Sequence, residues 1–315
     1  MFTGILAGIT WALETVVLGI ALNMSPFVST TQAIFLAPFI GTFLHDTFSA
    51  LFMFIYNMVN GNIKRVFEVL KSESFKWLVL ASCIGGPVGM TGYVLAVNNM
   101  GASIGAVASA IYPAIGTVLA FLFLKEKIKG YQWIFLIFTL LGVYGLSYTP
   151  TINIENFWLG LLGAFMCAFG WGIEAVILAK CLKNPKIKNE YALLIRQTTS
   201  ALVYGIIIIP ALSGWSFTVS LFVNDVGSLI PTIAVAALCA TVSYLFYYKT
   251  IANVGASKAM ALNITYTAWA IVFAVIVFRD FSVLNPLTIL CTAVVVICGI
   301  LSATDIKKFL KKHKQ

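Results

Sequence analysis

The chain has 315 residues, of which 60% are hydrophobic and only 10% are charged, and its mean hydropathy is +0.97. Soluble domains carry about 25% charged residues, so this composition excludes a soluble globular protein and predicts an all-α integral membrane protein. The net charge of +9 comes from lysines and arginines in short segments. That placement is typical of membrane topology signals and argues against nucleic-acid binding.

Apolar segments of about 20 residues are long enough to cross a bilayer as helices. The first segment is expected to remain in the protein, because it has no basic region before it and carries Glu14. A tight turn near residues 253–255 separates the eighth segment from the ninth. We therefore expect ten transmembrane helices, at residues 2–22, 31–59, 77–97, 102–124, 131–149, 157–180, 190–212, 228–250, 257–278 and 284–303.

The basic residues orient these ten spans. Eighteen of the twenty lysines and arginines fall on one side of the membrane if both termini are cytoplasmic. Arg279 is expected at an outside end, and Arg196 lies within the seventh span, near enough to its cytoplasmic end to snorkel. The eighteen lie in or beside loops 60–76, 125–130 and 181–189, at Lys249 and Lys258, and in the tail that ends the chain.

The two halves of the chain contain matching positions. A shift of 154 residues aligns Gly101-Ala102-Ser103 with Gly255-Ala256-Ser257, and Lys125-Glu126 with Arg279-Asp280. Each half has five spans, an odd number, so the halves must be inverted relative to each other in the membrane. We predict a first repeat at 1–150, a second repeat at 156–304 and a basic cytoplasmic tail at 305–315. The paired charges at 125–126 and 279–280 are expected to end their helices in solvent.

Carboxylates inside spans indicate function, because burying them in a membrane is costly. Glu14 and Glu174 each follow a tryptophan by three residues, so each pair shares one helix face, about 60° apart. Tryptophan and tyrosine faces attract cations. We predict substrate binding by Trp11, Glu14, Tyr93, Tyr112, Trp171, Glu174, Tyr244, Tyr247 and Tyr266, and proton coupling by Glu174, Asp46 and His45.

Whole stretches of the chain resemble known transporters. The ten-helix pattern and the segment from Gly101 to Gly142 resemble the EamA-type drug/metabolite transporter superfamily. Trp11, His45-Asp46, 86–90, 109–114, 170–174 and 195–197 resemble the LicB-type choline transporters of bacteria. This resemblance implies an aromatic box around choline, with Trp11 and Trp171 in it, in a bacterial plasma (inner) membrane. Glu14 departs from it, standing where a small or apolar residue is expected.

These observations favour a secondary active transporter that takes up choline or a related quaternary amine with protons, by alternating access. An exporter of amino acids or other metabolites is the alternative carrier. A lipid scramblase or membrane-embedded enzyme is the alternative from another class. The sequence has no P-loop, no nucleophile with a base and no cysteine pair or histidine cluster for a metal, so we expect no enzyme activity, no metal and no cofactor.

Overall fold

The computed structural model describes residues 1–101, 105, 107, 110–148, 154–223 and 227–305. The basic tail beyond 305 and the first part of the expected fourth span lie outside these residues. Within them all regular structure is helical, and eight helices are long and apolar enough to cross a membrane. They are Phe2–Leu22, Thr31–Val59, Glu73–Met100, Phe157–Cys181, Asn189–Ala211, Leu229–Val254, Ala256–Phe278 and Pro286–Ala303.

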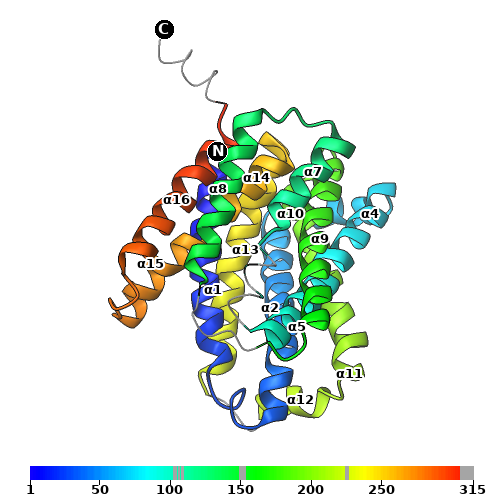
Figure 1. Cartoon of the computed structure of the whole chain (residues 1–315). Helices are drawn as coiled ribbons and strands as arrows, with labels where there is room; N and C mark the ends of the chain where they lie inside the picture. The colour runs from blue at the N-terminus through cyan, green and yellow to red at the C-terminus, as the bar shows by residue number, and fades with distance from the viewer. Residues whose placement is uncertain (102–104, 106, 108–109, 149–153, 224–226, 306–315) are drawn as a thin grey trace.

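Two shorter apolar helices, α7 (Tyr112–Leu124) and α8 (Gly130–Leu146), lie within the expected fourth and fifth spans. The protein is therefore an all-helical, multi-pass membrane protein (Figure 1). The remaining labels are α1 (Phe2–Leu22), α2 (Thr31–Val59), α3 (Ile63–Leu70), α4 (Glu73–Cys83), η1 (Ile84–Val88), α5 (Gly89–Met100), α9 (Phe157–Cys181), α10 (Asn189–Val203), η2 (Tyr204–Ile208), α11 (Ile209–Ala211), α12 (Trp215–Val223), α13 (Leu229–Val254), α14 (Ala256–Asn263), α15 (Tyr266–Phe278) and α16 (Pro286–Ala303).

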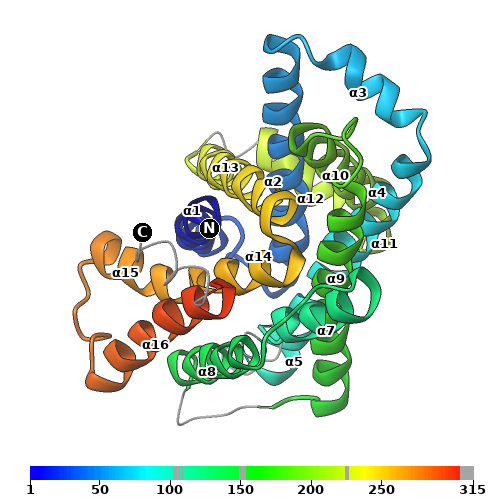
Figure 2. The same ribbon diagram turned by 90° about the horizontal axis from the view of Figure 1, so that it is seen from above.

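The helices of the two halves pack against each other and not as separate bundles. Figure 2 looks along the bundle and shows α1 beside α13, α14 and α15 of the second half. In the same way α9 of the second half packs on α5 and α7 of the first. The pairs α2 with α10, α8 with α16, and α7 with α14 also join the halves. Exchanging the two expected repeats turns α1–α13 into α5–α9 and α1–α15 into α7–α9, and it leaves α2–α10 and α8–α16 unchanged.

Matching backbone turns occur at positions that the shift of 154 residues relates. Gly101 and Gly255 follow α5 and α13 with φ of +80° and +92°, a conformation that a side chain would strain. Lys125 and Arg279 end α7 and α15 in the left-handed region, with φ of 55° and 54°. Thr304 at the end of α16 contacts the sulfur of Met1, so both ends of the described chain lie at one end of the bundle.

The ninth span and the end of the fourth differ from expectation in detail. The ninth span lies at Ala256–Phe278, as expected, but it is interrupted, because α14 ends at Asn263 and a turn at 264–265 precedes α15. α1 packs closely against this break, since a Cβ atom on Gly8 of α1 would lie 2.8 Å from Thr265 Oγ1. Glu126 is not simply solvated at the end of α7. It accepts hydrogen bonds from Ala256 N at 2.7 Å, Ser257 N at 3.2 Å and the Ser257 hydroxyl, and so binds the start of α14.

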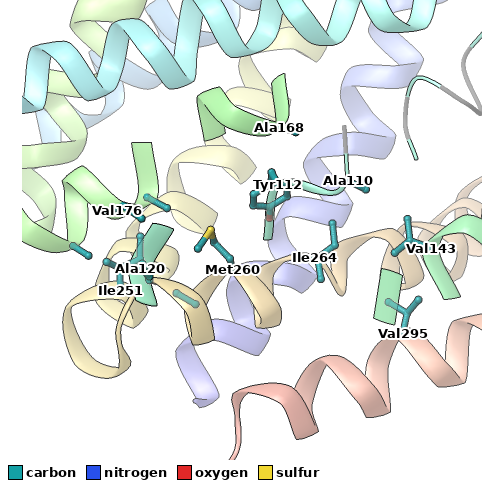
Figure 3. Packing of buried hydrophobic residues seen from close by; sticks show 14 of the residues in the cluster. Ala110, Tyr112, Ala120, Val143, Ala168, Val176, Ile251, Met260, Ile264 and Val295 are labelled. Carbon is teal, nitrogen blue, oxygen red and sulfur yellow. The ribbon is translucent and has the colours of Figure 1, made fainter. Parts of the chain in front are cut away.

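A buried apolar cluster lies where α7, α9, α13 and α14 meet, and Figure 3 shows its packing from close by. Tyr112 and Ala120 of α7 lie in it with Val176 of α9 and Met260 of α14. A Cβ atom on Gly116 of α7 would overlap the Met260 sulfur, so the glycine allows α7 and α14 to approach closely. Tyr112 belongs both to this core and to the cavity described next, so the core positions a wall of the cavity.

Candidate functional site

A cavity of about 500 Å³ lies between helices of both halves, and aromatic side chains form most of its wall. We call it the aromatic cavity. Six helices contribute to it, so no single sequence segment could form it. Its lining residues are Trp11 of α1, Tyr112 of α7, Trp171, Glu174 and Ala175 of α9, Tyr244, Tyr247 and Tyr248 of α13, Asn263 of α14 and Tyr266 of α15.

Edge-to-face contacts hold the rings of this cavity at defined angles. The Trp11 ring meets Tyr244 at a centroid distance of 4.8 Å and an interplanar angle of 89°. The Trp171 ring meets Tyr112 at 5.4 Å and 90°. Asn263 Nδ2 donates a hydrogen bond to the Tyr112 hydroxyl at 3.1 Å, which fixes that ring further. Such perpendicular pairs are favourable, and they leave ring faces held in place before any ligand enters.

Glu174 supplies the one carboxylate among the residues that line the aromatic cavity. It is 7% exposed, and Arg196 Nε donates to its Oε1 at 3.1 Å. Arg196 also lies over the Tyr244 ring, 4.8 Å from its centroid. Arg196 does not snorkel to the cytoplasm, although its place in the helix would allow it, because this residue is 4% exposed and held by buried carboxylates.

A second cavity, of about 1,100 Å³, adjoins the first, and we call it the outer cavity. Trp11, Trp171 and Tyr266 line both cavities and so separate them. Tyr93 lines only the outer cavity, where its ring stacks on Trp171 at 6.1 Å. The other walls come from the second half of α1, the first half of α2 and from α5, including Glu14, Thr15, Leu18, Gly19, Leu22, Pro38, Gly41, Thr42, Met90, Val94, Val97 and Asn98.

A chain of buried ionisable side chains runs from the outer cavity to the aromatic cavity. Glu14 Oε1 lies 3.5 Å from His45 Nε2, and His45 Nδ1 lies 3.0 Å from Asp46 Oδ1. Asp46 Oδ2 lies 3.5 Å from Arg196 Nη1, and Arg196 reaches Glu174. All five side chains are less than 10% exposed. The network thus connects a carboxylate of one cavity with that of the other.

The structure places the sequence-predicted residues in three groups. Seven line the aromatic cavity (Trp11, Tyr112, Trp171, Glu174, Tyr244, Tyr247 and Tyr266), Tyr93 and Glu14 line only the outer cavity, and His45 and Asp46 lie in the ionic network. The two Trp-Glu pairs are therefore not equivalent. The predicted set lacked Tyr248 and Asn263. Tyr248 follows Tyr247 and was open to prediction, whereas Asn263 faces the cavity only because α14 ends there.

Known proteins resemble this chain in sequence and in fold. Residues 1–148 match the EamA-like transporter family. The LicB protein of Haemophilus influenzae is 27% identical over 294 residues, which cover 92% of each chain. A solved crystal structure of a protein with 16% sequence identity superposes with a TM-score of 0.68 over 96% of this chain and 95% of that one. At that identity the likeness shows the fold alone.

The match to a transporter family agrees with the structure, in which the helices of a multi-pass membrane protein enclose a cavity. The resemblance inferred from the sequence is confirmed: residues 1–148 are an EamA-like transporter domain, and the chain as a whole is similar to LicB.

Proposed function

We propose that this protein is a secondary active transporter that takes up choline or a related quaternary amine together with protons. The observation that carries the proposal is the aromatic cavity, where two tryptophans and five tyrosines surround one carboxylate. A quaternary ammonium group has no N–H to donate, so ring faces and one negative charge are the groups that recognise it. A neutral amino acid also carries a carboxylate, and the residues that line this cavity include no lysine, arginine or histidine to pair with it.

Alternating access is supported by relations between the two halves. Four helix pairs between them, α1–α13, α1–α15, α2–α10 and α8–α16, have a counterpart or remain the same when the halves are exchanged, and positive φ angles recur at 101 and 255 and at 125 and 279. These relations are what two inverted repeats, 1–150 and 156–304, would produce. The outer cavity draws its walls from the end of the bundle remote from Met1, which is the external end if the termini are cytoplasmic. The structure then corresponds to a carrier open more to the outside.

Proton coupling is supported by the ionic network beside the aromatic cavity. Glu174 contacts both the cavity and Arg196, and Arg196 contacts Asp46, which holds His45. A cation that binds near Glu174 competes with Arg196 for that carboxylate, and Arg196 then shifts toward Asp46. A change of charge at one end of the network thereby changes the electrostatic potential at the other end.

Binding of candidate ligands to the purified protein tests the substrate class. Choline, a quaternary ammonium cation, is expected to raise the unfolding temperature in detergent, whereas ethanolamine and neutral amino acids are expected to have little effect. Stabilisation by neutral amino acids and not by choline would contradict the proposal and favour an exporter of metabolites.

Uptake of labelled choline into proteoliposomes under an imposed pH gradient tests the mechanism. Glu174→Gln keeps the size of the side chain and removes its charge, so it is expected to abolish the pH dependence of uptake while the protein still inserts. The exposed residue Glu73 offers a matched control, and Glu73→Gln should transport like the wild type. Transport by Glu174→Gln with unchanged pH dependence would exclude Glu174 from coupling.

A further inference from the structure

The geometry of the contact between Glu14 and His45 indicates that a proton lies between the two side chains. His45 Nε2 lies 3.5 Å from Glu14 Oε1, and the described residues form no hydrogen bond with Nε2. The two side chains are 6% and 5% exposed, so water does not solvate them freely. A buried ring nitrogen that faces only a carboxylate oxygen must be satisfied across that contact.

The other side of the ring shows where the hydrogens are. Asp46 Oδ1 lies 3.0 Å from His45 Nδ1, and Asp46 is held as a carboxylate by Arg196. Nδ1 therefore carries a hydrogen and donates it to Asp46. In a neutral imidazole Nε2 would then be a bare lone pair facing a carboxylate oxygen, which is an acceptor facing an acceptor. A proton on Nε2 turns this repulsion into a charge-assisted hydrogen bond.

The surroundings of the pair contain few other charges. Asp46 on the same helix and Arg196 of α10 are the charged groups next to it. The described residues contain no group of three or more His, Cys, Asp or Glu side chains placed to hold a metal ion. Phenols and a thiol, uncharged at neutral pH, interact with Glu14 or Asp46 from the remaining elements: Tyr93 of α5, Tyr204 of η2, Cys239 and Tyr244 of α13, and Tyr266 of α15.

We propose that Glu14 and His45 form a one-proton site at the outer cavity, and that this proton is the one that accompanies the organic cation. Glu14 lines the outer cavity, so protons reach the site from there. His45 is an imidazolium between the two carboxylates in the loaded site. Release of the proton leaves the Nε2 lone pair against Glu14 and drives the two side chains apart.

Charge balance links this site to the substrate, and this link rests on the proposed function. With the proton bound, the buried network holds three carboxylates against the imidazolium and the guanidinium of Arg196, so one negative charge is left over. A monovalent organic cation beside Glu174 brings the total to zero. Burying an uncompensated charge is costly, so the carrier closes most readily when both one proton and one cation are bound.

Nitrogen NMR of the histidine ring tests the proton site without any substrate. The chain contains two histidines, and His313→Gln leaves His45 as the single imidazole in the spectrum. We expect both ring nitrogens of His45 to be protonated at neutral pH, and Nε2 to lose its proton in Glu14→Gln. A bare Nε2 at neutral pH in the protein with Glu14 intact would overturn the proposal, and this measurement requires no variant of the site itself.

Proton flux in proteoliposomes tests the link to transport. In the wild type, choline uptake driven by a membrane potential should acidify the lumen, as read by an enclosed pH-sensitive dye. Glu14→Gln should still bind choline and carry it without acidification, whereas Glu73→Gln should acidify normally. Acidification by Glu14→Gln at the wild-type ratio to choline would overturn the proposal. If choline fails to bind while His45 is an imidazolium, the assigned substrate is wrong and the proton site stands.

Discussion

A methyl group at Gly85 is expected to act on the site chiefly by displacing Glu174. Gly85 lies in η1, and the three atoms nearest to a Cβ placed there all belong to Glu174. The methyl would overlap the carboxylate and lie 2.7 Å from Glu174 Cβ. Rotation of the side chain can move the carboxylate but not the Cβ atom, so η1 and α9 must also separate. Arg196 would then lose its hydrogen bond to Glu174.

The size of the effect follows from these overlaps. Forcing an extra methyl group into a packed interior costs about 1–3 kcal/mol. If Gly85→Ala must spend this free energy to place Glu174 where it binds choline, the affinity for choline falls by about 5- to 150-fold. Isothermal titration of choline measures the affinity, and thermal unfolding in detergent measures the stability separately. Gly130→Ala is the control, because a Cβ on Gly130 meets no atom within 4 Å and this residue lies outside both cavities.

Two results would refute this reasoning. If Gly85→Ala binds choline like the wild type and is equally stable, Glu174 does not occupy the position described. If Gly85→Ala loses stability but binds choline like the wild type, Glu174 occupies the position described but does not contribute to binding of the cation.

Two further variants test the aromatic wall and the contact between the halves. Trp171→Ala removes one ring face from the cavity, worth about 0.5–2 kcal/mol, so choline should bind about 2- to 30-fold more weakly, whereas Trp158→Ala, at a residue 76% exposed, should bind it normally. Equal affinities of these two variants in titration would contradict the cavity as the binding site. Glu126→Ala removes the acceptor for the first N–H groups of α14 and should lower the unfolding temperature, and so should Gly255→Ala, which is strained at a φ of +92°. Their effects should be less than additive, because a Cβ on Gly255 would lie 2.5 Å from Glu126 Oε1; full additivity in a double-mutant cycle would argue against the contact.

Much of the helical framework was open to prediction because the bilayer demands long apolar segments. The first and second spans agree with α1 and α2, and the turn near 253–255 contains the positive φ of Gly255. The break in the ninth span was not predictable from hydropathy, since Ala256–Phe278 is on average long and apolar enough to cross a membrane, although it contains Lys258 and Asn263. Tertiary packing of α1 against 262–265 accompanies that break, and burial within protein replaces the membrane there.

The candidate site shows the same division. Glu174, Trp171 and Trp11 stood out in the sequence because a carboxylate inside an apolar span is costly and tryptophans near mid-span are not typical of the membrane interface. The distance of Arg196 from the helix end would allow it to reach water, and only its neighbours Asp46 and Glu174 explain why it stays buried.

By itself, the sequence determined that the chain lies in a membrane, which side chains inside the spans carry charge, and that tryptophan precedes two of the carboxylates by three residues. Each of these follows from composition or from spacing along one helix. The tertiary structure alone decided that Glu14 and Glu174 belong to different cavities and that one arginine and one histidine connect them. The physical reason is that the two parts of this network join through the packing of α2 against α10, where Asp46 meets Arg196, and local periodicity cannot specify which faces of distant helices come into contact.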